Sequence, residues 1–390
     1  MTSPALSSHS SSQECISLTS QWVGGLSLEN FRCYETLSME VDARPVVLTG
    51  ENGAGKTNVL EALSFLSSGR GLRRSKLSQI SNLKNPEKGW TVFSKVHTKE
   101  GVQDIGTGLT KESGERRLIK VNQTPMSQSD LSNLLSIFWV TPQIDQLLNE
   151  SMSTRRRFFD KLVASFFPEH SQHLYRYEYA FRERSRLLKE GGRDPSWISI
   201  LEQKMAQESM ALNSLRQVFL SEINPLAQAA VSGFPKTKIE LEGGVESLCA
   251  DMPALIVEEK IQEILEKNRG EDARSGGSQI GAHQTQVHFL HLDQKIFSEF
   301  CSTGEQKALL LSLVLANCRL HKERKEKTPL LLLDEVVAHL DKRRRQSLCE
   351  EILSLGTQCW MTGTEESSFL PFGGNVQYFC VRDRNIIRKK

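Results

Sequence analysis

The chain has 390 residues, and its 38% hydrophobic and 25% charged side chains are typical of a soluble globular protein of two lobes. Its 49 basic and 47 acidic residues leave a net charge of +2, so overall charge gives no argument for a nucleic-acid partner. The cysteines form no Cys-x-x-Cys pair, which excludes a zinc-finger pattern and favours reduced thiols in a cytoplasmic protein. No membrane association is expected, because no apolar run approaches the roughly 20 residues of a membrane span and the N-terminus lacks the layout of a secretion signal.

Residues 1–20 are rich in serine and threonine, and we expect them to form a disordered tail. Beyond them, alternating apolar positions at 26–28 and at 37–41 predict two β-strands. The turn between these strands carries Arg32. If the two strands flank the next motif, Arg32 is expected near a bound nucleotide, the alternative being a surface arginine.

A glycine-rich segment then matches the phosphate-loop pattern G-x-x-x-x-G-K-[ST], through Gly50, Glu51, Asn52, Gly53, Ala54, Gly55, Lys56 and Thr57. The glycines allow a tight turn whose amides point at phosphate oxygens. Lys56 is expected to reach the β- and γ-phosphates, and the Thr57 hydroxyl to ligate Mg²⁺. An apolar run before the loop and leucines at helical spacing after it supply the strand-loop-helix context that the motif needs.

Two less specific segments follow the loop. Residues 69–76 carry arginines and a lysine between glycines, which indicates either a contact to a phosphate backbone or a solvated loop. Residues 90–121 alternate weakly and predict an antiparallel meander of edge strands. The apolar run at 137–140 predicts a buried strand, and Gln143 just after it can reach a metal ion and a γ-phosphate, although a turn glutamine without function is equally common.

Residues 142–279 predict a mainly helical lobe between a first part of the lobe that carries the phosphate loop, at 21–141, and a second part of it at 280–390. A helix capped by Ser153-Thr154 is expected to begin with three arginines at 155–157, which indicate either a DNA or partner contact or a solvated first turn. Heptad-like apolar spacing from 198 to 219 predicts a helical hairpin. Residues 253–268 predict one amphipathic helix, and residues 269–277 a polar, glycine-rich linker.

The last part of the chain carries carboxylates at the end of an apolar run. Four leucines at 330–333 are typical of a buried parallel strand, and Asp334 and Glu335 follow them directly. Asp334 is expected to hold Mg²⁺ through water, with Thr57 and Gln143 as the other metal contacts. Glu335 is expected to polarise the attacking water, and with Lys56 and Gln143 to form the catalytic set.

Taken in order, these segments resemble an ABC-type ATPase head, and more closely the RecF family of bacterial recombination and repair proteins. Over residues 24–366 the matching pieces are LSLENFRCYETL, GENGAGKTNVLEALSFLSSGRGLR, TPQIDQL with STRRRFFD, IGAHQ, STGEQKALL, LLLLDEVVAHLD and TGT. The separation of Lys56 from Ser302 is longer than in transporter ATPases and lacks the long coiled coil of SMC and Rad50 relatives. The run at 281–284 is Gly-Ala-His-Gln where the family usually has Gly-Pro-His-Arg.

The resemblance implies an α/β fold, namely an ABC-type P-loop ATPase head with an antiparallel β region and an inserted, mainly helical second lobe. It places Gln143 in the Q-loop, Asp334 and Glu335 in the Walker B motif and Asp341 in the D-loop. It also implies that the signature residues contact the γ-phosphate of ATP held by another subunit; these residues are Ser302, Gly304 and Gln306. From the residues alone, the serine and glycine equally suit a simple helix N-cap.

The same resemblance implies ATP and Mg²⁺ as cofactors and a role in recombinational repair and replication restart. ATP would join two subunits head to head, and the homodimer would bind double-stranded DNA near single-stranded gaps and help to load RecA together with RecO and RecR. Slow, DNA-stimulated ATP hydrolysis would reset it. The alternatives are another SMC-like chromosome or repair ATPase, or an ATP-dependent assembly scaffold whose main ligand is protein.

Overall fold

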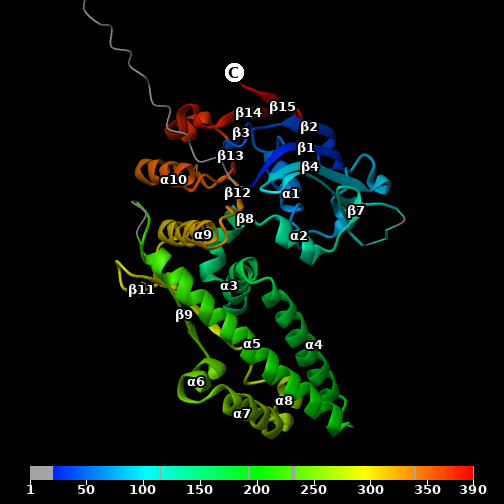
Figure 1. Ribbon diagram of the computed structural model, residues 1–390, viewed down its shortest axis with the longest axis vertical. Helices are drawn as coiled ribbons and strands as arrows, with labels where there is room; N and C mark the ends of the chain where they lie inside the picture. Colours follow the sequence, from blue (N-terminus) through cyan, green and yellow to red (C-terminus); the bar gives the residue numbers. More distant parts are fainter. Residues whose placement is uncertain are drawn as a thin grey trace, which may run out of the picture.

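The computed structural model describes residues 21–111, 113–114, 116–191, 194–229, 233–337 and 340–389. The predicted tail at 1–20 lies outside these residues. Figure 1 shows two parts: an upper part with sheets and flanking helices, and a lower part in which long helices run away from it. The first part contains both the beginning and the end of the described chain, as the interrupted lobe predicts.

A mostly parallel sheet forms the centre of the upper part, in the order β15-β14-β3-β13-β12-β8. Its strands are β3 (Val46–Thr49), β8 (Ile137–Val140), β12 (Leu330–Leu333), β13 (Cys359–Gly363), β14 (Gln377–Arg382) and β15 (Asn385–Arg388). Only β15 runs antiparallel to its neighbour. All four leucines of β12 are buried, because helices and the second sheet cover both faces of a central parallel strand. The carboxyl ends of β3, β12 and β8 meet at one edge, and the nucleotide motifs follow directly from them.

A second sheet is antiparallel, in the order β2-β1-β4-β5-β6-β7. Its strands are β1 (Trp22–Phe31), β2 (Tyr34–Glu40), β4 (Trp90–Thr98), β5 (Gly101–Leu109), β6 (Leu118–Val121) and β7 (Thr124–Pro125). The predicted meander is confirmed, but β4 is not an edge strand, because it pairs with both β1 and β5. Helix α1 (Lys56–Ser64) packs between the two sheets, where its Leu60 and Leu63 share a core with Leu26 and Trp360.

The helical lobe consists of α3 (Met152–Phe166), α4 (Glu169–Lys189), α5 (Pro195–Gln228), α6 (Gly244–Asp251), α7 (Ala254–Lys267) and α8 (Arg269–Ser275). Helices α4 and α5 run side by side in Figure 1, and the predicted apolar seam of α5 is buried from Ile198 to Phe219 except for the partly buried Leu215. The predicted helix at 253–268 is confirmed as α7. Helix α3 begins at Met152 after Ser151, so Ser153 and Thr154 lie inside its first turn rather than at its cap.

A small third sheet crosses the expected boundary between residues 279 and 280. It has the order β11-β10-β9, from β9 (Thr237–Glu242), β10 (Gln286–His291) and β11 (Ile296–Phe297). Strand β10 pairs with β9 along its whole length, so the chain returning toward the ATPase lobe is still part of the inserted lobe. Hydrophobic alternation predicted both strands but carried no information about their pairing.

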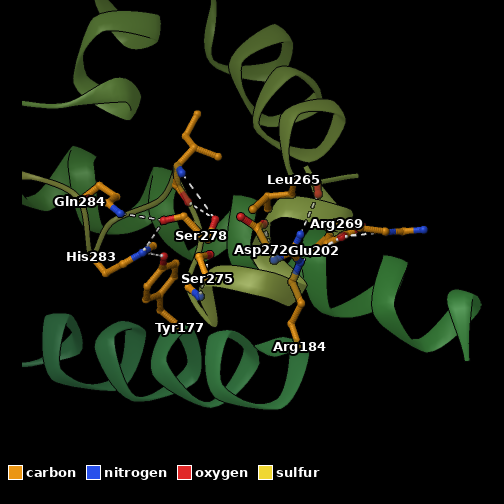
Figure 2. A network of polar contacts seen from close by, with 12 residues as sticks. Tyr177, Arg184, Glu202, Leu265, Arg269, Asp272, Ser275, Ser278, His283 and Gln284 are labelled. Carbon is orange, nitrogen blue, oxygen red and sulfur yellow. Dashed lines mark hydrogen bonds and ion pairs between the residues drawn. The ribbon is translucent and has the colours of Figure 1, made fainter. Parts of the chain in front are cut away.

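The predicted linker at 269–277 is wrong, because most of it forms α8. A buried network holds this helix, as Figure 2 shows. The Arg184 guanidinium of α4 donates to Asp272 of α8 at 2.8 Å and to Glu202 of α5 at 2.9 Å, and Arg269 donates to Glu202 at 2.6 Å. The polar residues that suggested a solvated linker are therefore tertiary contacts.

The remaining elements surround the nucleotide edge. They are η1 (Leu77–Gln79), η2 (Pro86–Lys88), α2 (Gln128–Leu134), η3 (Pro142–Asn149), η4 (Ser298–Phe300), α9 (Thr303–Lys325), α10 (Lys342–Leu355) and η6 (Glu366–Asn375). Helix α9 is buried almost all round, because α5, α10 and the parallel sheet surround it. Among the described helices, none combines the length and apolarity that crossing a membrane requires.

Candidate nucleotide site

The phosphate loop joins the carboxyl end of β3 to the first residue of α1, and two of its glycines are required by geometry. Gly50 has φ 154° and Gly55 has φ 114°. A Cβ on Gly50 would lie 2.2 Å from the Val381 carbonyl oxygen, and one on Gly55 would lie 2.7 Å from the Tyr34 hydroxyl. Gly53, at φ 82°, faces open space. Close packing therefore fixes the two ends of the loop and leaves its middle accessible to a ligand.

Lys56 lies with its ammonium group folded over this loop. Its Nζ donates to the carbonyl oxygens of Gly50 at 2.8 Å and Glu51 at 2.9 Å, and it lies 4.0 Å from Glu335 Oε1. Burial lowers the pKa of Lys56, while the charges of Glu335 and Asp334 act in the opposite direction. A buried cation at the mouth of a loop with open amides fits the phosphates of a nucleotide.

Asp334 lies at the centre of a cluster of hydroxyl groups at the end of β12. Its Oδ1 accepts from Thr57 Oγ1 at 2.9 Å and from Thr362 Oγ1 at 2.8 Å. The hydroxyl oxygen of Thr362 in turn accepts from the backbone N–H of Glu335 at 2.9 Å. A threonine hydroxyl beside a carboxylate is the oxygen set that Mg²⁺ prefers, so the predicted metal residues Thr57 and Asp334 fit this ion.

Glu335 and Thr362 show what the parallel sheet adds to the motifs. Glu335 has φ 55°, a left-handed conformation that turns its half-exposed side chain toward Lys56 instead of along the strand direction. The resemblance places Thr362 and Thr364 in the final switch, where other ABC ATPases have a histidine, and does not give Thr362 a role in the site. The sequence contained an indication of this position, because a polar residue at the end of a parallel strand next to β12 lies at the same carboxyl edge as Asp334.

Arg32 lies beside α1 and contacts Glu61 of that helix. It makes two hydrogen bonds to the carboxylate of Glu61, at 2.8 and 2.6 Å, and further bonds to Ser75 and to the Gln79 carbonyl. Glu61 is fully buried, so the pair fixes the helix that carries Lys56 and Thr57. All three guanidinium nitrogens have partners within the chain, and the nucleotide contact expected for Arg32 stays a prediction.

The signature segment begins α9 and is open to solvent at its start. Ser302 caps the helix by accepting from the Glu305 N–H, and both Ser302 and Gly304 are exposed. The expectation for Gln306 does not fit, because its side chain is fully buried. Its amide exchanges hydrogen bonds with Asn149 at 2.9 and 2.6 Å, so it holds the helix start against the end of η3 and is not free for a ligand.

Asp341 caps α10 on the same side as the signature segment. Its Oδ1 accepts from the Arg344 N–H at 2.8 Å, and its side chain is exposed. Arg344 also donates to Glu305 at 2.8 Å, which brings the predicted D-loop and the predicted signature residues together. Burial acts to raise the pKa of Glu305, but the hydrogen bond and charge of Arg344 lower it overall.

Gln143 follows β8 near the start of η3, at the carboxyl edge beside β12. Its side chain lies outside the part of the chain that the structure describes. The backbone alone places it where a Q-loop residue is expected, and its role stays a prediction.

The basic segments divide into paired and unpaired arginines. Arg73 contacts Glu61 at 3.3 Å, Arg155 contacts Glu299 at 2.9 Å, and Arg156 donates to the Thr285 carbonyl at 3.1 Å. Arg157, by contrast, is exposed. Two of the three consecutive arginines therefore position elements of the helical lobe, which the sequence could not distinguish from a ligand contact.

The run at 281–284 is held by polar contacts within the helical lobe (Figure 2). The Tyr177 hydroxyl bonds to His283 Nδ1, and His283 Nε2 faces the Ser278 carbonyl at 3.0 Å. Because that carbonyl only accepts, Nε2 carries the proton and Tyr177 donates to Nδ1. Gln284, in place of the family's usual arginine, donates to the same carbonyl at 2.7 Å. The replacement thus acts as a loop contact.

Comparisons with known proteins agree on one family. The family model for the RecF/RecN/SMC N terminal domain matches residues 22–370. The DNA replication and repair protein RecF of Rhizobium meliloti (strain 1021) is 40% identical over 93% of this chain and 97% of its own length. The protein of the same name from Agrobacterium fabrum is 40% identical over 91% and 96%.

Solved structures show the same fold. A structure of the recombination mediator protein RecF-ATPrS in the RecFOR pathway is similar with a TM-score of 0.83 at 22% identity, over 96% of this chain and 99% of that chain. The Smc head domain from Pyrococcus furiosus is similar with a TM-score of 0.53 at 17% identity, over 95% and 96%. The predicted α/β head of the ABC type, with its antiparallel β region and helical insertion, is confirmed. On the family model and the identity to curated relatives along nearly the whole length, the chain belongs to the RecF family.

Proposed function

We propose that this protein is an ATP-dependent DNA-binding protein of recombinational repair and replication restart. Its relatives are named DNA replication and repair proteins, and a structural neighbour is a recombination mediator of the RecFOR pathway. The arrangement of the nucleotide site supports the further proposal that ATP joins two copies head to head.

The observation that carries this proposal is the separation of the site into two groups. Lys56, Thr57, Asp334 and Glu335 form one group at the carboxyl edge of the parallel sheet. In the described chain, no hydrogen bond or ion pair joins Ser302 to that group, although Ser302 is exposed at the start of a long helix. A helix N-terminus without a ligand of its own fits a γ-phosphate presented by a second copy, since both amides and dipole favour an anion.

Each residue then has a separate task in ATP hydrolysis. Lys56 and the amides of the phosphate loop bind and orient the phosphates, and Thr57 and Asp334 hold the metal. Bound Mg²⁺ supplies positive charge to the phosphate oxygens. Glu335, held by Thr362 at its backbone, orients and deprotonates the attacking water. Ser302, Gly304 and Asp341 of the second copy exclude solvent and complete the charge stabilisation, while Gln306 acts only by fixing the helix start.

Size-exclusion chromatography with light scattering, with and without ATP and Mg²⁺, tests the dimer directly. We expect a monomer without nucleotide and a dimer with ATP-Mg²⁺, because Ser302 and the exposed start of α9 have no ligand until a second copy presents ATP. A mass that does not depend on nucleotide would refute the shared site. The same samples with EDTA test whether the Thr57 and Asp334 pair needs a divalent cation.

DNA binding measured over a salt series separates this proposal from a protein-assembly scaffold. An ATP-gated clamp for duplex DNA near single-stranded gaps binds more tightly with ATP and loses affinity steeply with salt, since bound cations are released from phosphates. We propose slow hydrolysis stimulated by DNA, and partners of the RecO and RecR type. Absent or salt-insensitive DNA binding would favour the scaffold instead.

A further inference from the structure

A cleft of about 1330 Å³ separates the ATPase lobe from the helical lobe. One wall is the loop at 67–74, which follows α1. The other wall is formed by α3 and α4, and the end of β8 contributes Trp139. No nucleotide motif lines this cleft, so it is a second site next to the one described above.

Unpaired cations converge on the cleft from both lobes. Arg70 and Arg74 come from the loop after α1, and Arg157 and Lys161 lie one helical turn apart on α3. Within the described residues, none of these four side chains makes an ion pair, whereas Arg216, which also lines the cleft, bonds to Asp160 at 2.9 Å. Four basic side chains from both lobes that meet in one cleft without an acidic partner in the part of the chain described indicate an anionic ligand.

The acidic residues of the cleft do not cancel these charges. Asp160 accepts from Arg216 and from His170 at 3.0 Å, and Glu178 lies 3.7 Å from Arg182 on its own helix. The Asp130 carboxylate bonds to Ser127 at the start of α2. Asp160 and Glu178 therefore each face an arginine, and the basic side chains that line the cleft outnumber its carboxylates.

Lys161 and Arg74 connect the two walls. The Lys161 ammonium lies 3.0 Å from the centre of the Trp139 ring, a cation–π contact that keeps it inside the cleft. Burial and the positive charge of Arg74 lower the pKa of Lys161 well below its usual value. An anion bound between Lys161 and Arg74 would favour the charged form of Lys161.

Aromatic groups accompany the cations along the helical wall. Tyr175 of α4 is 69% exposed, although a tyrosine on a long helix would usually pack. Tyr177 and His283 also line the cleft and are joined by a hydrogen bond (Figure 2). Cations that follow a backbone, together with exposed rings on which bases stack, are the features of sites for single-stranded nucleic acid. A duplex would leave the exposed Tyr175 ring unused, because its bases face inward.

We propose that this cleft between the lobes binds single-stranded DNA, so that the protein holds the unpaired strand beside a duplex. The inference rests on the proposed DNA-binding function and adds a separate subsite to it. The loop that carries Arg70 and Arg74 continues directly from α1, and Arg73 of the same loop contacts Glu61 on that helix. Strand binding is thereby connected to the helix whose first residues hold the nucleotide phosphates.

The test compares three labelled DNAs by fluorescence anisotropy, with ATP-Mg²⁺ present: a blunt duplex, the same duplex with a single-stranded tail, and a thymidine oligonucleotide. The variant R70Q/R74Q/R157Q removes three exposed charges from the cleft. The matched control K95Q/K111Q/K120Q removes three exposed charges from the antiparallel sheet and its loop. Thermal melting and ATP-dependent dimerisation of both variants check that fold and nucleotide site are intact.

We expect the cleft variant to bind the oligonucleotide about 100-fold more weakly at 0.1 M salt, and its salt slope to fall by about 2, since each lost contact to a single strand contributes about 0.7. It should bind the tailed duplex no better than the blunt one. The control should keep the wild-type preference for the tail.

Three results would overturn the inference: an unchanged affinity of the cleft variant for the oligonucleotide, an equal loss on blunt duplex and oligonucleotide, or an equal loss in the control variant. Failure of the proposed function looks different, because the wild-type protein would then bind none of the three DNAs. Replacement of Tyr175 by alanine adds a readout that charge alone would not give. It should weaken binding of the oligonucleotide while leaving the salt slope unchanged.

Discussion

Replacing Arg184 by methionine should destabilise the helical lobe far more than the same change at Arg182, two residues along α4. Arg184 is 1% exposed and donates to Glu202, to Asp272 and to the Leu265 carbonyl. Arg182 is 68% exposed and lies 3.7 Å from Glu178. The two variants remove the same charge from the same helix and differ only in burial.

The cost follows from what the buried arginine leaves behind. Glu202 keeps Arg269 as a partner, but Asp272 loses Arg184, its only charged partner among the described residues, and its Oδ1 has no hydrogen bond there either. Burial raises the pKa of Asp272 even with Arg184 present. Removing one member of a buried pair costs about 3–5 kcal/mol, whereas losing an exposed pair costs up to about 1 kcal/mol.

Hydrogen exchange of α8 measures this difference locally. Opening of α8 should become about 100- to 1000-fold more frequent in R184M, as expected from roughly 3–4 kcal/mol, and change little in R182M. The double variant R184M/D272L should recover part of the protection, because it removes the uncompensated carboxylate. Equal exchange in R184M and R182M, or no recovery in the double variant, would refute the assignment of the network as the support of α8.

Four further outcomes test the nucleotide site and the core. Lys56→Ala should abolish ATP-dependent dimerisation, because the buried phosphate contact is lost; dimers measured by light scattering in this variant would contradict that role. Glu335→Gln should bind ATP normally but slow turnover by at least about 100-fold and accumulate dimer, so wild-type turnover would remove Glu335 from the chemistry. Ser302→Arg should leave ATP binding to the monomer intact, as seen by equilibrium dialysis, and prevent dimers. Burial lowers the pKa of His321 to about 3, so the stability that the neutral imidazole contributes is present above its ordinary pKa of 6.5 and is lost as pH falls. The variant His321→Leu should therefore lose about 2 kcal/mol less unfolding free energy than the wild type between pH 7 and 5. Urea titrations that show the same pH dependence for both proteins would contradict this role.

Features that depend on neighbouring residues in the chain were accessible from the sequence. The phosphate loop is contiguous, and its glycines, lysine and threonine lie within one turn, so the sequence alone brings Lys56 and Thr57 to one place. The leucine run before Asp334 was sufficient for a buried strand, because a strand covered on both faces needs continuous apolar residues. The seam of α5 was equally visible, since helical periodicity is a local property.

Features that depend on contacts between distant residues were decided only by the tertiary structure. The linker expected at 269–277 becomes α8 because Arg184 lies 88 positions away in sequence from Asp272. Gln306 is buried against Asn149, to which its side-chain amide donates a hydrogen bond. Thr362 lies beside Asp334 because β13 pairs with β12. The three consecutive arginines differ for the same reason. Arg155 and Arg156 bond to residues distant in the sequence, whereas Arg157 is exposed, and the sequence around them does not show these partners. Composition and spacing fix which chemistry a chain can perform, whereas burial and pairing select the side chains that remain free to perform it.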